Sequence, residues 1–278
     1  MRAASFLLGT IAIAAPIAIP IYRWEYQQTA GKSIIWAPVA LGAVFIAALW
    51  SWGRYGHQLS TPWQRLGFGG GILWGRSWLL AFGLGAVAVS TLYGLQLGLG
   101  WARLSGSAPS SRSLVEGLGV ALLVGLAEEL VFRGWLLFEL EQDYAPPVAL
   151  WLNALLFAIA HYIRPWAVIL ETWPQFLGLG LLGLTLVWAR RSPLSRDRSA
   201  TTALALPAGL HGGLVWAYYQ VDVNDLILPH AGPQWLTGID GNPLAGLLGM
   251  GLMGGIALLF YRWSHQRPAA PPPATPRR

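Results

Sequence analysis

Residues 117–138 have the sequence GLGVALLVGLAEELVFRGWLLF, an apolar stretch that carries two adjacent carboxylates and one guanidinium. Glu128 and Glu129 stand at its centre, and Arg133 follows Glu129 by four residues. A charge at the centre of a membrane costs about 2.5–3.5 kcal/mol on insertion scales, so such residues are rare there unless they have a function. Three charges in one apolar helix therefore indicate a membrane protein with a functional site inside it.

The composition of the whole chain is that of a membrane protein. Of 278 residues, 55% are hydrophobic and 11% are charged, whereas soluble domains carry about 25% charged residues. The chain has no cysteine, which excludes disulfides, thiolate catalysis and zinc sites built from Cys. Basic cytoplasmic loops explain the net charge of +6 better than nucleic-acid binding does, so we expect no nucleic-acid partner.

Apolar segments of about 20 residues predict an all-α, polytopic transmembrane helical bundle of about eight spans. The expected helices cover residues 4–22, 33–52, 77–101, 113–139, 147–161, 167–189, 201–219 and 243–263. With the N-terminus inside, twelve of the 18 Lys and Arg residues fall on the cytoplasmic side and five on the outside, with Arg133 between them. This asymmetry favours cytoplasmic N- and C-termini.

The domain organisation is expected to be simple. Residues 1–267 are predicted to form a single membrane-embedded helical domain, with the functional core at about 113–219. A disordered Pro-rich tail is predicted for residues 268–278. A cleaved signal peptide is the weaker interpretation of the N-terminus, because the first apolar run continues past the small residues that resemble a cleavage site.

The two carboxylates are expected to differ in role. Adjacent helical residues point about 100° apart, so Glu128 and Glu129 are not placed to share one proton. Glu129 and Arg133 are spaced i,i+4 in the favourable acid-first order and are expected to pair. That pairing leaves Glu128 as a general base for water. The alternative is a buried Glu–Arg clamp that only fixes helix packing.

Two histidines lie in other apolar segments. His161 closes the run 155–160, with Phe157 one turn before it, and His211 lies in the glycine-rich segment 206–214. Polar groups on separate membrane helices face inward, so both imidazoles are expected to converge with the carboxylates. Solvated imidazoles are expected for the other histidines, which lie in predicted loops or the tail: His57, His230 and His265.

Two mechanisms fit this set of residues. Two His and one Glu can form a catalytic zinc site with an open water position, here from Glu128, His161 and His211. The same residues could instead activate water without a metal, with a histidine stabilising the oxyanion. The spacing does not decide between them, and the absence of a His-Glu-x-x-His arrangement excludes ordinary zincin chemistry.

The order Glu128-Glu129-x-x-x-Arg133, then Phe157-x-x-x-His161, then His211 resembles the CPBP family. This family comprises type II CAAX prenyl endopeptidases and bacteriocin-processing enzymes, intramembrane proteases that are often described as metalloproteases. The resemblance implies that Glu128 activates the attacking water and that Glu129 and Arg133 organise the site. It implies that His161 and His211 bind a divalent metal such as zinc or stabilise the oxyanion.

The resemblance also implies a partner and a location. The substrate is expected to be a membrane-anchored protein or peptide, reached from the cytoplasmic side. The chain itself is expected to be an integral protein of the lipid bilayer, in the plasma membrane of a prokaryote.

At one position the chain departs from the family pattern. The family often has Asn or Asp four residues after the third-motif histidine, where this chain has Val215. The change removes a polar group that would coordinate metal or bind the oxyanion. Asn153, two turns before His161, is the candidate replacement donor.

The leading hypothesis is thus a CAAX-like intramembrane endopeptidase. A non-catalytic membrane scaffold or immunity-type protein of the same fold is the alternative, which Val215 slightly favours. A proton-coupled carrier is a third hypothesis because intramembrane Glu, Arg and His also mark ion paths, although no inverted repeat is visible in the sequence.

Overall fold

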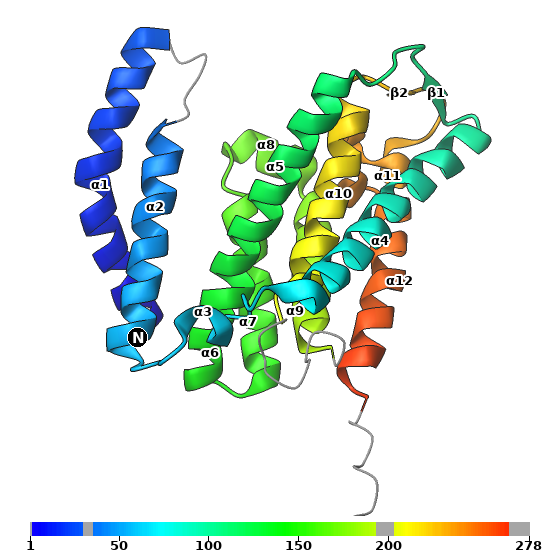
Figure 1. The fold of residues 1–278 in the computed structure, drawn as a ribbon. Coiled ribbons are helices and arrows are strands. Elements are labelled where there is room, and N and C mark those ends of the chain that lie inside the picture. The colour runs from blue at the N-terminus through cyan, green and yellow to red at the C-terminus, as the bar shows by residue number, and fades with distance from the viewer. Residues whose placement is uncertain (1, 30–35, 193–202, 267–278) are drawn as a thin grey trace, which may run out of the picture.

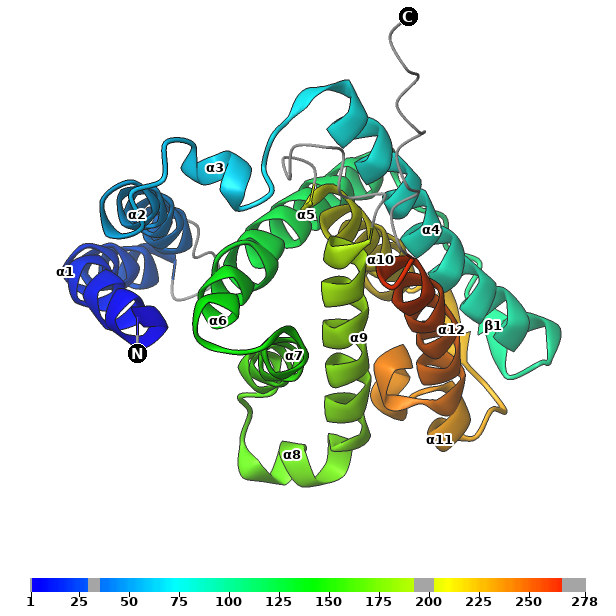
Figure 2. The same ribbon diagram turned by 90° about the horizontal axis from the view of Figure 1, so that it is seen from below.

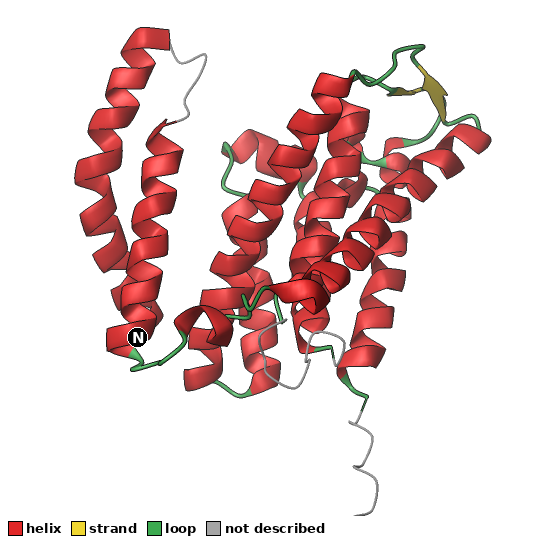
Figure 3. Ribbon diagram, in the orientation of Figure 1, coloured by secondary structure: helices red, strands yellow, loops and turns green. Residues whose placement is uncertain are grey.

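The computed structural model describes residues 2–29, 36–192 and 203–266, which form a helical bundle with one small sheet (Figures 1 and 3). Its elements in chain order are α1 (Arg2–Thr29), α2 (Trp36–Ser51), the π-helix η1 (Trp52–Gly56), α3 (Pro62–Arg65), α4 (Gly71–Gly98), β1 (Ala102–Leu104), α5 (Ser111–Glu129), the π-helix η2 (Leu130–Leu136), α6 (Leu137–Asp143), α7 (Pro146–His161), α8 (Trp166–Thr172), α9 (Pro174–Arg191), α10 (Ala205–Val223), β2 (Ile227–Pro229), α11 (Gln234–Thr237), the 3₁₀ turns η4 (Ile239–Gly241) and η5 (Pro243–Ala245), and α12 (Leu247–Ser264).

The all-helical prediction is confirmed apart from the two short antiparallel strands β1 and β2, in which Arg103 lies opposite Leu228. The predicted helix 167–189 is two helices, α8 and α9. Four helices in the described part are long and apolar enough to cross a membrane, or five if the pair α7 and α8, bent by 119°, counts as one span. The protein is thus an integral membrane protein, while eight spans and cytoplasmic termini stay predictions. The predicted disordered tail lies outside the described residues.

The first two long helices stand beside the rest of the bundle. In Figures 1 and 2, α1 and α2 form a hairpin next to η2 and α6. Phe6 of α1 packs on Trp135 of η2, with ring centroids 4.6 Å apart. His57, after η1, lies 2.6 Å from Glu139 of α6, and its side chain is 9% exposed. The expectation that His57 is solvated is therefore wrong, because this histidine ties the hairpin to the bundle.

Glycines set how closely α10 approaches its neighbours. A Cβ at Gly213 would collide with the carbonyl oxygen of Phe82 in α4, and one at Gly209 would collide with that of Trp78. On the other side, a Cβ at Gly125 of α5 would lie 3.0 Å from the backbone nitrogen of Gly212. Small residues let membrane helices pack backbone to backbone. They therefore hold α10 between α4 and α5, at the level of His211.

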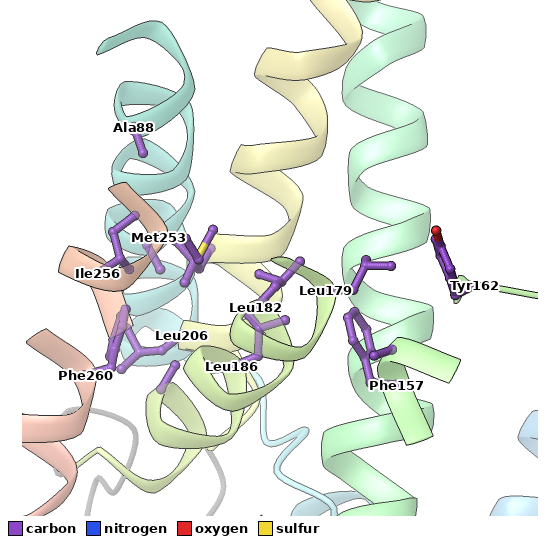
Figure 4. Packing of buried hydrophobic residues seen from close by; sticks show 14 residues of the cluster. Ala88, Phe157, Tyr162, Leu179, Leu182, Leu186, Leu206, Met253, Ile256 and Phe260 are labelled. Atoms are coloured by element: carbon purple, nitrogen blue, oxygen red, sulfur yellow. The ribbon is translucent and has the colours of Figure 1, made fainter. Parts of the chain in front are cut away.

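Side chains of α7, α9, α10 and α12 fill the centre of the bundle. Figure 4 shows Phe157, Leu182 and Phe260 among the buried residues of this cluster, with Met253 and Ile256 beside them. Phe157 is fully buried, and it connects this core to the charged residues of η2. The core therefore supports one wall of the site directly.

We predict that Gly213→Ala destabilises the protein by about 1–3 kcal/mol, because the added methyl group overpacks the contact between α4 and α10. Thermal unfolding in detergent, followed by circular dichroism, measures the effect. The matched control is Gly255→Ala in α12, where a Cβ meets nothing within 4 Å. Equal stability of the two variants would contradict a close α4–α10 contact.

Candidate active site

The site is built on the junction of α5 and η2, where Glu129 and Arg133 form a fully buried ion pair. The Nη1 of Arg133 donates to Oε1 of Glu129 at 2.8 Å, and its Nη2 donates to the carbonyl oxygen of Gly183 in α9 at 3.1 Å. Both side chains have no exposed surface. The predicted pairing is confirmed, and it fixes η2 against α9.

Phe157 connects this pair to the histidines. The guanidinium carbon of Arg133 lies 4.2 Å from the centroid of the Phe157 ring, which is a cation–π distance. The same ring lies 4.2 Å from the His161 ring, centroid to centroid. The Phe-x-x-x-His spacing therefore has a structural reason, since one turn of α7 presents an aromatic face to the arginine and an imidazole to the carboxylate.

Asn153 does not take part in the site as proposed from the sequence. Its Nδ2 donates to the carbonyl oxygen of Phe132 at 2.7 Å, and the side chain is fully buried. Phe132 also accepts the backbone N–H of Leu137, since η2 has the wider hydrogen bonding of a π-helix. Asn153 supports the π-helix instead, so its assignment as a replacement oxyanion donor is wrong.

Glu128 is bound to His161. The Nε2 of His161 lies 2.8 Å from Oε2 of Glu128, and its Nδ1 lies 2.8 Å from the carbonyl oxygen of Phe157. A carbonyl oxygen only accepts, so Nδ1 carries a proton, and one further proton lies between Nε2 and the carboxylate. The two side chains are about a quarter exposed, at 27% and 29%. Glu128 is therefore a partly accessible carboxylate that shares a proton with an imidazole.

His211 approaches both carboxylates from α10. Its Nδ1 donates to Oε1 of Glu129 at 3.0 Å, so in the neutral ring the lone pair is on Nε2. That Nε2 lies 3.9 Å from Oε2 of Glu128. The separation is too long for a direct hydrogen bond, and one water molecule can bridge it.

The charges in this cluster nearly balance. Glu128 and Glu129 carry two negative charges and Arg133 carries one positive charge, so a single protonated imidazole makes the group neutral. Burying an uncompensated charge is costly, which favours this count. The position of His161 between two acceptors makes it the histidine that holds the extra proton.

A cavity of about 220 Å³ opens beside the two imidazoles. Its walls are apolar side chains of α4, α7, α9, α10 and α12, several of which Figure 4 shows. Four polar side chains also line it: His161, His211, Tyr218 and Asn242. Glu128 is not part of the wall and lies one hydrogen bond beyond His161. The cavity suits an apolar chain segment placed next to two imidazoles.

The described residues do not form a ready metal site. No group of three or more His, Cys, Asp or Glu side chains in the described ranges is arranged to hold a metal ion. The contacts of His161 with a carbonyl and of His211 with a carboxylate are of the kind that orient metal-binding histidines. However, Nε2 of His161 and Oε2 of Glu128 contact each other directly and share a proton. A metal ion bound by both atoms would have to replace that proton. Metal binding by Glu128, His161 and His211 stays a prediction.

All five predicted site residues are brought together from α5, η2, α7 and α10. The sequence interpretation missed Tyr218 and Asn242. Tyr218 follows His211 by seven residues, two helical turns, and this spacing could have placed both on one face. Asn242 comes from a loop before α12, and no periodic signal marks it.

Comparison with known proteins agrees with this core. Residues 110–217 match the family model described as type II CAAX prenyl endopeptidase Rce1-like. The match contains all five site residues, and it confirms the resemblance recognised in the sequence. No curated protein and no solved structure matches the chain.

We predict that Glu129→Gln destabilises the protein by about 3–5 kcal/mol, because it leaves Arg133 as an uncompensated buried charge. Chemical unfolding in detergent measures this loss. Glu116→Gln is the matched control, since Glu116 and Arg112 form an exposed i,i+4 pair on the same helix. We expect less than about 1 kcal/mol there. Equal losses would mean that the Glu129–Arg133 pair is not buried as described.

Proposed function

We propose that this chain, whose residues 110–217 match the model of the Rce1-like type II CAAX prenyl endopeptidase family, is an intramembrane endopeptidase that uses Glu128 to activate water. The observation that carries the proposal is the arrangement of Glu128 with two imidazoles. His161 is bound to the carboxylate, and the Nε2 of His211 lies one water molecule away from it.

The attacking water lies between Oε2 of Glu128 and Nε2 of His211, and it donates a hydrogen bond to each. Its oxygen forms a bond to the carbonyl carbon of the scissile peptide while Glu128 takes its proton. The Nε2–H of His161, released from the neutralised Glu128, then donates to the oxyanion. When the C–N bond breaks, the proton on Glu128 passes to the leaving nitrogen. The products are an amine and a carboxylic acid, which keeps the second proton of the water.

Glu129 and Arg133 act as positioning residues. Oε1 of Glu129 accepts from both Arg133 and Nδ1 of His211. This double contact keeps the lone pair of His211 on the nitrogen that faces Glu128. Arg133 balances the charge of Glu129, so that Glu128 remains the carboxylate available for proton transfer.

The cavity favours an apolar, membrane-anchored substrate. Its wall residues are almost all aliphatic or aromatic, and Val215 is one of them. Val215 extends the apolar wall at the position where the family often has Asn or Asp. His161 therefore carries the stabilisation of the oxyanion in this chain, while His211 orients the water. The plasma membrane of a prokaryote is the location that we propose.

The scaffold alternative has no comparable support. A residue that only fixed helix packing would be enclosed, as Glu129 is, whereas the Glu128 side chain is 29% exposed. Its partner His161 also lines the cavity. Both features fit proton transfer to a bound molecule.

We predict that Glu128→Gln lowers the cleavage rate of a co-expressed membrane-anchored substrate by about 100-fold or more, because the amide cannot accept the proton of water. Cleavage is measured on immunoblots at matched expression, and melting temperatures show whether the variant folds. Glu116→Gln, an exposed carboxylate on the same helix, is expected to retain activity. Full activity of folded Glu128→Gln would remove Glu128 from the mechanism.

A metal-independent mechanism predicts that cleavage by the purified protein survives dialysis against a strong chelator. The measurement compares rates before dialysis, after it, and after zinc is returned. Loss of activity that zinc restores, with zinc bound in about one equivalent, would instead make Glu128, His161 and His211 a ligand set. The melting temperature of the dialysed protein separates metal loss from unfolding.

A further inference from the structure

A second cavity, of about 200 Å³, adjoins the first at the end of the bundle that carries β1 and β2 (Figure 1). Tyr218 of α10 lines both cavities. Gly241 lines the second and is followed in the chain by Asn242, which lines the first. A single bound peptide segment could therefore extend from one cavity into the other.

The walls of the two cavities differ in charge. Three carboxylates line the second: Asp222 at the end of α10, Asp225 before β2, and Asp240 in η4. Its lining includes no Lys, Arg or His, and residues 220–242 contain no Lys or Arg. The carboxylates thus make a negative concave surface, which attracts cations.

A buried amide points to the second feature of the ligand. Gln96 of α4 lines the same cavity and is 5% exposed, yet its Nε2 is buried without a hydrogen-bond partner in the described structure. A buried donor that stays unpaired costs about 1–3 kcal/mol, so a bound acceptor would be favourable there. A bare metal cation offers no acceptor. A ligand that combines a positive charge with a carbonyl oxygen would satisfy both features of this cavity.

We propose that this second cavity is a substrate subsite that binds a Lys or Arg side chain close in sequence to the scissile bond. Asp222, Asp225 and Asp240 attract the cation, and Gln96 donates to a backbone carbonyl of the same segment. The inference rests on the proposed function, which supplies the cleavage beside the subsite. It places the apolar segment of the substrate in the first cavity and the basic residue in the second.

The walls of the subsite are held in place by the small sheet and by α4. β2 begins two residues after Asp225 and pairs with β1, whose Ala102 lies opposite Pro229. The hydroxyl of Tyr93, also in the wall, donates to the carbonyl oxygen of Gly241 at 3.4 Å. The loops that carry the acids are thus joined to the end of α4, where Gln96 lies.

The test uses binding, so that it does not depend on cleavage. The full-length Glu128→Gln protein in detergent is titrated with two fluorescein-labelled peptides, each an apolar hexaleucine segment followed by one variable residue. That residue is arginine in one peptide and its neutral isostere citrulline in the other. We expect the arginine peptide to bind about five- to tenfold more tightly, a preference that shrinks as salt is raised.

Variants then locate the preference. Asp222→Asn with Asp240→Asn should abolish it, and Gln96→Leu should weaken both peptides alike. Glu171→Gln, which removes an exposed carboxylate of α8 that lies outside the cavity, should leave the preference unchanged. Melting temperatures establish that each variant folds.

Two outcomes would overturn the subsite. One is equal binding of the two peptides. This result would overturn the subsite even if the cavity binds Ca²⁺. The other is an arginine preference that survives loss of the aspartates. The proposed function fails separately: if the wild type cleaves nothing while the aspartate-dependent preference persists, the cavity still binds a basic side chain but the protease is ruled out.

Discussion

The site depends on one interaction, the fully buried contact of Arg133 with Glu129. An isolated charge at this position would be costly, so the arginine and the carboxylate are stable only together. Arg133 also binds the carbonyl oxygen of Gly183 and packs on the ring of Phe157. Three helical segments, η2, α9 and α7, are thus held at one point. The second acceptor contact of Glu129 orients His211, which brings in α10.

Close packing of α10 is the condition for that contact. Glycines on α10 and α5 remove the side chains that would separate the backbones, and they bring His211 to the level of the carboxylates. The π-helix contributes in the same way. It rotates the residues after Glu129, and Asn153 stabilises it through the carbonyl oxygen of Phe132. The ion pair, the glycines and the π-helix therefore act as one structural unit.

Much of this unit could be predicted from the sequence because its signals are local. The i,i+4 spacing of Glu129 and Arg133 predicts their pairing, and the cost of charge in a membrane predicts that both histidines turn inward. The role of Asn153 was missed because a π-helix leaves no spacing signal. His57 was misassigned because its partner Glu139 lies 82 positions away in the chain. The predicted helix 167–189 contains both α8 and α9, because apolar length alone does not reveal where a helix breaks.

The two cavities lie next to each other and differ in wall chemistry. The first is apolar and adjoins the imidazoles, and the second is acidic and lies beyond Tyr218. Segments that leave a bilayer change from apolar to polar over a few residues. An extended chain rises about 3.3 Å per residue, so neighbouring cavities bind residues close in sequence. Selection of a substrate would then depend on where its apolar run ends, a property that Glu128 alone could not recognise.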